Sequence, residues 1–90
     1  MPNLLVECDV QTGLFKTEYL VSVPPGFAFY MDREDVQGVT EPPVAGKSVK
    51  GRVLAYLIEE RNGEALIEMT GTPVSGGVRI SVPKTITQAA

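Results

Sequence analysis

The dipeptide Asn62–Gly63 separates two apolar runs, residues 49–60 and 65–70. Asn-Gly in this setting is the strongest short-range signal for a β-hairpin, because both residues accept the positive φ angles of a type I′ turn. The longest strand of the chain is therefore predicted to belong to an antiparallel hairpin. The residue pairs that face each other in this register are Arg61 with Glu64, Ile58 with Ile67, and Tyr56 with Met69. The charged pair beside the turn supports the register.

Residues 49–60 are apolar on both faces of the predicted strand. Successive side chains point to opposite faces, so the odd-numbered residues 53–57 share one face and the even-numbered residues 54–58 share the other. A strand that is apolar on both sides is covered on both. Either the sheet curls into a barrel with loops packed outside, or another subunit covers one face. The candidate interface residues are Val53, Leu54, Tyr56 and Leu57.

Two further runs, residues 4–10 and 14–23, alternate between apolar and polar with a period of two. This period is typical of half-buried strands. Thr12–Gly13 between them indicates a second hairpin, with either a two-residue turn or a three-residue loop that has a bulge at Gly13. The pairs predicted for the two-residue turn are Val10 with Phe15, Cys8 with Thr17, Val6 with Tyr19, Leu4 with Val21, and Asp9 with Lys16.

Turn-forming residues divide the rest of the chain. Pro24–Pro25–Gly26 ends the second strand, because proline has no N–H to donate and glycine permits a reversal. The segments expected after it are an aromatic strand at 27–31 with Phe27 and Phe29 facing the core, a helical turn at 32–38 with Asp32 as N-cap, a loop at 39–48, a strand at 78–83 that ends at Pro83, and a frayed tail from Lys84. These segments predict one all-β domain over residues 1–90, a small antiparallel barrel or sandwich of about six strands with one short helical turn.

The residue types argue against common catalytic chemistry. The chain has no histidine, which excludes a Ser-His-Asp triad, a Cys-His pair and any histidine metal site. A single cysteine, Cys8, forms no internal disulfide. Cys8 lies on the inward face of its predicted strand, where cysteine behaves as a small apolar side chain. We therefore expect no enzymatic activity, no cofactor and no metal site.

Lys47, Lys50 and Arg52 form the basic cluster of the sequence, and Lys50 and Arg52 share a strand face. Such a cluster is able to hold a small anion or a nucleic-acid backbone. The net charge of −3 argues against nucleic-acid binding, since a dedicated nucleic-acid binder is usually basic overall. Tyr30 points away from the core face of its strand and is a candidate contact residue, because tyrosine is enriched in interfaces.

These patterns favour a non-catalytic β-domain that acts by association, either as a homo-oligomer or by binding a protein partner. An inhibitor, an accessory subunit and a phage structural protein all belong to this class. The alternative is a ligand- or nucleic-acid-binding module that uses Lys47, Lys50 and Arg52. The apolar run at 53–58 is too short to span a membrane, and residues 1–5 lack the pattern of a signal peptide. We therefore expect a cytoplasmic protein with no membrane partner.

Overall fold

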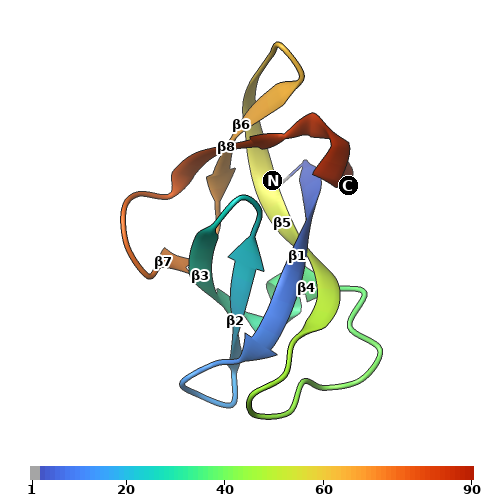
Figure 1. The fold of residues 1–90 in the computed structure, drawn as a ribbon, viewed down its shortest axis with the longest axis vertical. Helices are drawn as coiled ribbons and strands as arrows, with labels where there is room; N and C mark the ends of the chain where they lie inside the picture. Colours follow the sequence, from blue (N-terminus) through green and yellow to red (C-terminus); the bar gives the residue numbers. More distant parts are fainter. Residues whose placement is uncertain (1–2) are drawn as a thin grey trace.

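A computed structural model describes residues 3–90 and confirms the all-β prediction (Figure 1). The first two residues, on which the signal-peptide interpretation partly rests, lie outside this range. The described chain has nine strands rather than about six, because three of the strands are only two or three residues long. The elements are β1 (Leu4–Thr12), β2 (Glu18–Val23), β3 (Phe27–Asp32), η1 (Arg33–Asp35), β4 (Val36–Gln37), β5 (Val49–Arg61), β6 (Glu64–Met69), β7 (Thr72–Pro73), β8 (Arg79–Pro83), η2 (Lys84–Ile86) and β9 (Thr87–Ala89).

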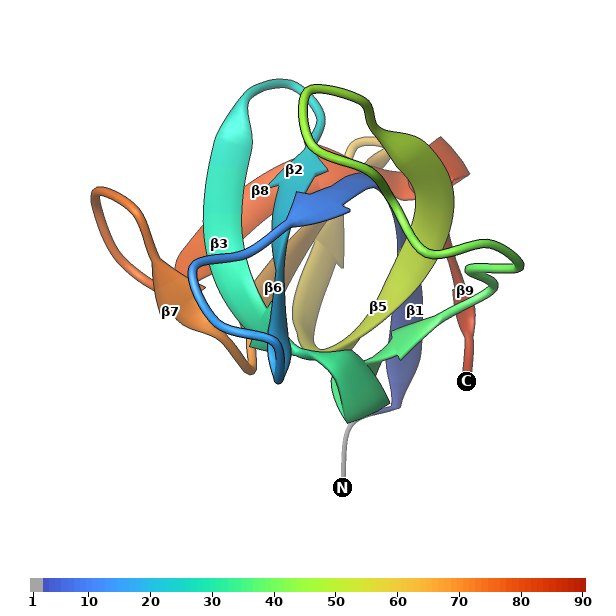
Figure 2. The same cartoon turned by 90° about the horizontal axis from the view of Figure 1, so that it is seen from below.

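One antiparallel sheet curls around a single interior and forms a half-barrel (Figure 2). Its strand order is β7-β3-β2-β1-β5-β6-β8, while β4 pairs with β5 and β9 pairs with β1. The inward side chains of the long strands form the core, as their alternation predicts. The largest fully buried side chains are Phe29, Met31, Ile67, Val6, Val10, Val21, Val23, Val53 and Val82. Cys8 is buried with them, as predicted.

The C-terminal segment is ordered, so the prediction of a frayed tail is wrong. Lys84 begins the short helix η2, and its N–H donates a hydrogen bond to the carbonyl oxygen of Gly63 at 2.9 Å. Residues 87–89 then pair with residues 4–6 of β1. The segment therefore leads from β8, which pairs with β6 at the edge of the sheet, back to β1, which it joins through β9. The predicted strand end at Pro83 is confirmed, since β8 ends at this proline, and β8 lies at the edge of the sheet order beside β6.

The first hairpin is confirmed, but its predicted register is wrong. Val10 pairs with Val21 rather than with Phe15. Residues 13–17 therefore form a five-residue loop in place of a two-residue turn. The register differs by six residues, an even number, so the same side chains still point inward. Periodicity is the same in both registers and does not distinguish them.

Phe15 leaves the core as a result of this register. It lies in the loop with 69% of its surface exposed. Gly13 defines the start of the loop, because a Cβ at this position would meet the carbonyl oxygen of Glu18 at 2.7 Å. The N–H of Glu18 closes the loop by donating to the carbonyl oxygen of Phe15 at 3.2 Å. Phe29 is buried in the core as predicted, but the core position predicted for Phe27 is wrong, because Phe27 lies at the exposed end of β3.

The second hairpin turns at Asn62–Gly63 as predicted, with φ angles of 53° and 79°. The pairing of Arg61 with Glu64 is also confirmed. Beyond the turn the register shifts at a β-bulge, so the predicted partners of Ile58 and Tyr56 are wrong. The pairs on the far side of the bulge are Leu57 with Ile67, Tyr56 with Glu68, and Ala55 with Met69. Ile58 is the extra residue, and such a residue is left without a cross-strand partner.

The predicted helical turn is present but shorter than expected. It is the 3₁₀ turn η1, with Asp32 at the N-cap position, although no cap hydrogen bond forms from the Asp32 side chain. The chain returns to an extended conformation at Val36, not at Gly38, because β4 pairs there with β5. The loop that leads to β5 follows, as predicted.

Candidate functional site

The outer face of β5 carries apolar side chains at the surface of the molecule. On its inner face, Val53 and Ala55 are completely buried and Leu57 is partly buried. On the outer face, 37% of Tyr56 is exposed and Leu54 is half-buried, and Ile58, the bulge residue beyond Leu57, is 42% exposed. Leu66 of β6 is half-buried on the same outer face. We call Leu54, Tyr56, Ile58 and Leu66 the outer strip.

One of the four predicted interface residues, Val53, is fully buried in the core and is not available to a partner while the domain is folded. Leu57 packs against the core from the inner face and is partly exposed. Leu54 and Tyr56 lie at the surface together with Ile58 and Leu66.

Charged pairs surround the outer strip. Tyr56 lies opposite Glu68, whose carboxylate is 3.0 Å from the Arg79 guanidinium. Near the turn, Glu59 and Arg61 form an ion pair of 2.6 Å. Exposed pairs of this kind contribute little to stability. An apolar centre with a polar rim is, however, the usual organisation of a protein–protein interface.

A surface hollow of about 360 Å³ adjoins the strip at Leu66. Its other lining residues are Glu59, Arg61, Asn62, Glu64 and Ser81. The Ser81 hydroxyl donates a hydrogen bond to the Glu64 carboxylate at 2.6 Å. The hollow is therefore apolar at Leu66 and predominantly acidic around it.

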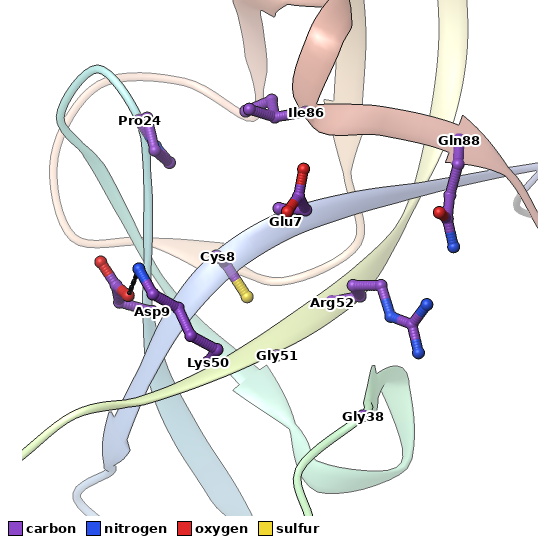
Figure 3. A pocket seen from close by; sticks show the side chains of 10 residues that line it. All are labelled: Glu7, Cys8, Asp9, Pro24, Gly38, Lys50, Gly51, Arg52, Ile86 and Gln88. Atoms are coloured by element: carbon purple, nitrogen blue, oxygen red, sulfur yellow. Dashed lines mark hydrogen bonds and ion pairs between the residues drawn. The ribbon is translucent and has the colours of Figure 1, made fainter.

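A second depression, an open groove of about 650 Å³, lies over β1 and β5 (Figure 3). The Lys50 ammonium donates a hydrogen bond to Asp9 at 2.7 Å, and this bond together with the Asp9 charge raises the pKa of Lys50. The Arg52 side chain extends toward Gly38 (Figure 3) and makes no ion pair within residues 3–90. Glu7 lies opposite Arg52 in the strand pairing. Two acids and two bases thus share the groove, and their charges balance.

The structure brings together only part of the predicted basic cluster. Lys50 and Arg52 both line the groove. Lys47 lies in the exposed loop before β5 and does not line it. Tyr30 is half-buried on β3, which β2 and β1 separate from β5 in the sheet order. A combined site of these four residues is therefore not formed.

Cys8 has the properties of a structural residue. Burial, and then the neighbouring Asp9 charge, raise the pKa of its thiol from 9.0 to about 12. At about pH 8 the thiol is therefore protonated and shielded, and the thiolate is the reactive form. We expect Ellman's reagent to leave the folded protein unlabelled at this pH and to modify one thiol per chain after unfolding in guanidinium. Rapid labelling of the folded protein would contradict the buried position.

The raised pKa of the Cys8 thiol also predicts that the folded protein loses stability at alkaline pH. The folded-state pKa of Cys8 lies above its unfolded value, so the stabilising contribution is complete below about pH 8.5 and is lost as the pH rises toward 12. Replacing Cys8 with Ala should reduce the slope of unfolding free energy against pH in this window. Denaturant titrations of both proteins from pH 8 to 11 measure the difference.

Sequence reasoning missed the most exposed apolar pair of the molecule. Leu14 and Phe15, at the tip of the loop between β1 and β2, are 71% and 69% exposed. The signal in the sequence is that they are two bulky apolar residues in succession, directly after Gly13. Within a half-buried strand only one of two successive residues faces the core, so one member of the pair needs another explanation.

The chain matches no protein family, and comparisons with curated proteins and with solved structures find no match either. No helix in the described part of the chain is long and apolar enough to cross a membrane. Within residues 3–90, no three side chains among cysteine, aspartate and glutamate come together as a candidate metal site. The surface features described above are therefore the basis for a functional proposal.

Proposed function

We propose that this chain is a non-catalytic association domain that forms a homo-oligomer, and that the outer strip on β5 and β6 is its contact surface. The observation that carries the proposal is the exposure of Tyr56 and Ile58 on a strand whose inward residues Val53 and Ala55 are fully buried. The chain's own fold covers the outer face of β5 only in part. A second copy would cover the rest.

The surroundings of the outer strip support this proposal. Tyrosine at the centre of an apolar patch is a frequent hot spot of binding energy, and ion pairs such as Glu68–Arg79 supply a polar rim. A chain with a net charge of −3 associates with itself most readily where both signs of charge are present. The rim of the outer strip carries both signs. A cytoplasmic location, which we also propose, suits a protein whose one cysteine is free and buried.

An anion- or nucleic-acid-binding function has less support. Lys50 is already engaged by Asp9 at 2.7 Å, and Glu7 lies opposite Arg52. Phosphate binding depends on uncompensated positive charge, which this groove does not concentrate. The outer strip is therefore the better-supported contact surface.

The Tyr56→Lys variant should weaken self-association by at least about thirtyfold, the effect of losing a hot-spot residue. The variant should stay folded, because the introduced ammonium group would lie opposite Glu68 within the same chain and form a favourable cross-strand pair. In the oligomer, the same ammonium group would be buried at the contact. Native mass spectrometry and sedimentation equilibrium, read against the 9.7 kDa chain mass, measure the change.

Val74→Lys is the matched control. Val74 is an exposed apolar residue in the loop between β7 and β8, outside the outer strip. Its replacement should leave the oligomer mass unchanged. If the wild-type protein sediments as a 9.7 kDa monomer at every accessible concentration, self-association is not the function of this surface.

A further inference from the structure

The loop between β1 and β2 presents Leu14 and Phe15 as a projecting apolar knob. They are the two most exposed large apolar side chains among the described residues. The domain does not bury either of them. Contiguous exposed apolar residues of this kind mark interaction sites more often than isolated ones do.

The knob is held in a defined conformation. The Glu18 N–H donates to the Phe15 carbonyl oxygen at 3.2 Å, and the Arg33 N–H donates to the Thr17 carbonyl oxygen at 3.1 Å. The Arg33 guanidinium also lies 4.7 Å from the centre of the Tyr19 ring, at the base of the loop. A loop that is already ordered loses little conformational entropy on binding. The knob is therefore prepared to dock without rearrangement.

The knob and the hairpin that carries much of the outer strip lie toward opposite ends of the molecule. In Figure 1 the loop after β1 is at the bottom, and the turn between β5 and β6 is at the top. The longest dimension of the molecule is 37 Å. A contact between the knob and the strip would therefore need a second copy of the chain.

The charges beside the two features are complementary. Lys16 follows the knob directly and has no ion-pair partner in the described part of the chain. Glu59, Glu64 and Arg61 line the hollow beside Leu66, and because Arg61 pairs with Glu59 at 2.6 Å, the hollow keeps one uncompensated negative charge. A phenyl ring over Leu66 would bring the neighbouring ammonium group close to these carboxylates.

We propose that copies of this chain assemble head to tail, with Leu14 and Phe15 of one copy packed on the outer strip of the next and Lys16 facing Glu59 and Glu64. This inference rests on the proposed self-association and specifies how it occurs. The contact is heterologous, so each copy uses two different surfaces and keeps one of each free. Repetition of such a contact gives a closed ring or a filament rather than a two-fold dimer.

Other binding surfaces for the knob are less favoured. The surface around it, with Lys16, Asp32, Arg33 and Glu34, carries balanced charge, so an anionic lipid surface is not selected. The large groove over β1 and β5 has apolar lining at Pro24 and Ile86, but its two acids and two bases balance, so it does not complement Lys16. The outer strip is the apolar surface of this chain that adjoins a hollow with acidic walls.

Mixing two variants tests the head-to-tail arrangement. Phe15→Ser removes the knob and retains the strip, while Tyr56→Lys alters the strip and retains the knob. Each variant alone should be monomeric, with the dissociation constant raised at least about thirtyfold. An equimolar mixture should form a dimer with one copy of each variant, because each chain supplies the surface that the other lacks. Native mass spectrometry identifies this dimer from the different chain masses.

Several outcomes would overturn the arrangement. If Phe15→Ser assembles like the wild type while Tyr56→Lys is monomeric, the strips pair with each other and only the proposed function stands. If both variants are folded by circular dichroism and monomeric, but the mixture forms no dimer, the knob does not bind the strip. A wild-type protein that is monomeric and binds vesicles of phosphatidylcholine and phosphatidylserine through Phe15 would contradict both proposals. Val44→Ser, at an exposed apolar position in the loop before β5, is the matched control and should assemble normally.

Discussion

Phe29→Ala is expected to lower the free energy of unfolding by about 3–5 kcal/mol, the usual cost of truncating a buried phenylalanine. The side chain lies in the middle of β3 and is only 1% exposed. A domain of this size has a total stability of roughly 5–13 kcal/mol, so the variant should lose at least about a quarter of it. Urea denaturation followed by circular dichroism measures the loss directly.

The matched control is Phe15→Ala, the same chemical change at an exposed loop position. We expect it to alter the free energy of unfolding by less than about 0.5 kcal/mol, as is usual at the surface. The pair of variants also tests the register of the first hairpin. If Phe15→Ala costs as much as Phe29→Ala, then Phe15 is buried and the five-residue loop is wrong.

Gly71→Ala is expected to cost about 2–3 kcal/mol through overpacking. A Cβ at this position would collide with the carbonyl oxygen of Tyr30 and with the sulfur of Met31. The Tyr30 carbonyl belongs to the backbone of β3, and Met31 is itself buried in the core. Neither group moves without disturbing the pairing of β3 with β7.

Gly77→Ala is the control for this prediction. A Cβ at Gly77 would meet no atom within 4 Å. The free energy of unfolding of Gly77→Ala should therefore stay within about 0.5 kcal/mol of the wild-type value. Thermal unfolding of the two variants in the same buffer should give a lower melting temperature for Gly71→Ala than for Gly77→Ala. Equal melting temperatures would mean that the chain does not pass close to β3 at Gly71.

The proposed assembly explains two exposed apolar features with one contact. Leu14 and Phe15 are too exposed to serve the core, and Tyr56 and Ile58 lie on a strand whose inner face already serves it. The domain, taken alone, leaves both features in water. A head-to-tail contact would bury both, while the core of each copy stays unchanged.

Local patterns in the sequence were sufficient for the fold class and for most of the core. A period of two identifies which residues share a face, and so it placed Val6, Cys8 and Val10 inside correctly. The turn at Asn62–Gly63 is also a local property, because these two residues accept positive φ angles. Such features depend on neighbouring residues alone and do not need the rest of the fold.

Pairing partners and surface exposure depended on the tertiary structure. An even shift of register keeps the same face inward, so alternation could not distinguish Phe15 from Val21 as the partner of Val10. The bulge at Ile58 and the pairing of β9 with β1 likewise arise between segments that are distant in the chain. On β5, where both faces are apolar, only the curvature of the sheet decided that Val53 and Leu57 face the core while Leu54 and Tyr56 face outward. The sequence by itself therefore determined which residues lie on a common face, and the tertiary structure decided which face was buried and which remained available for contact.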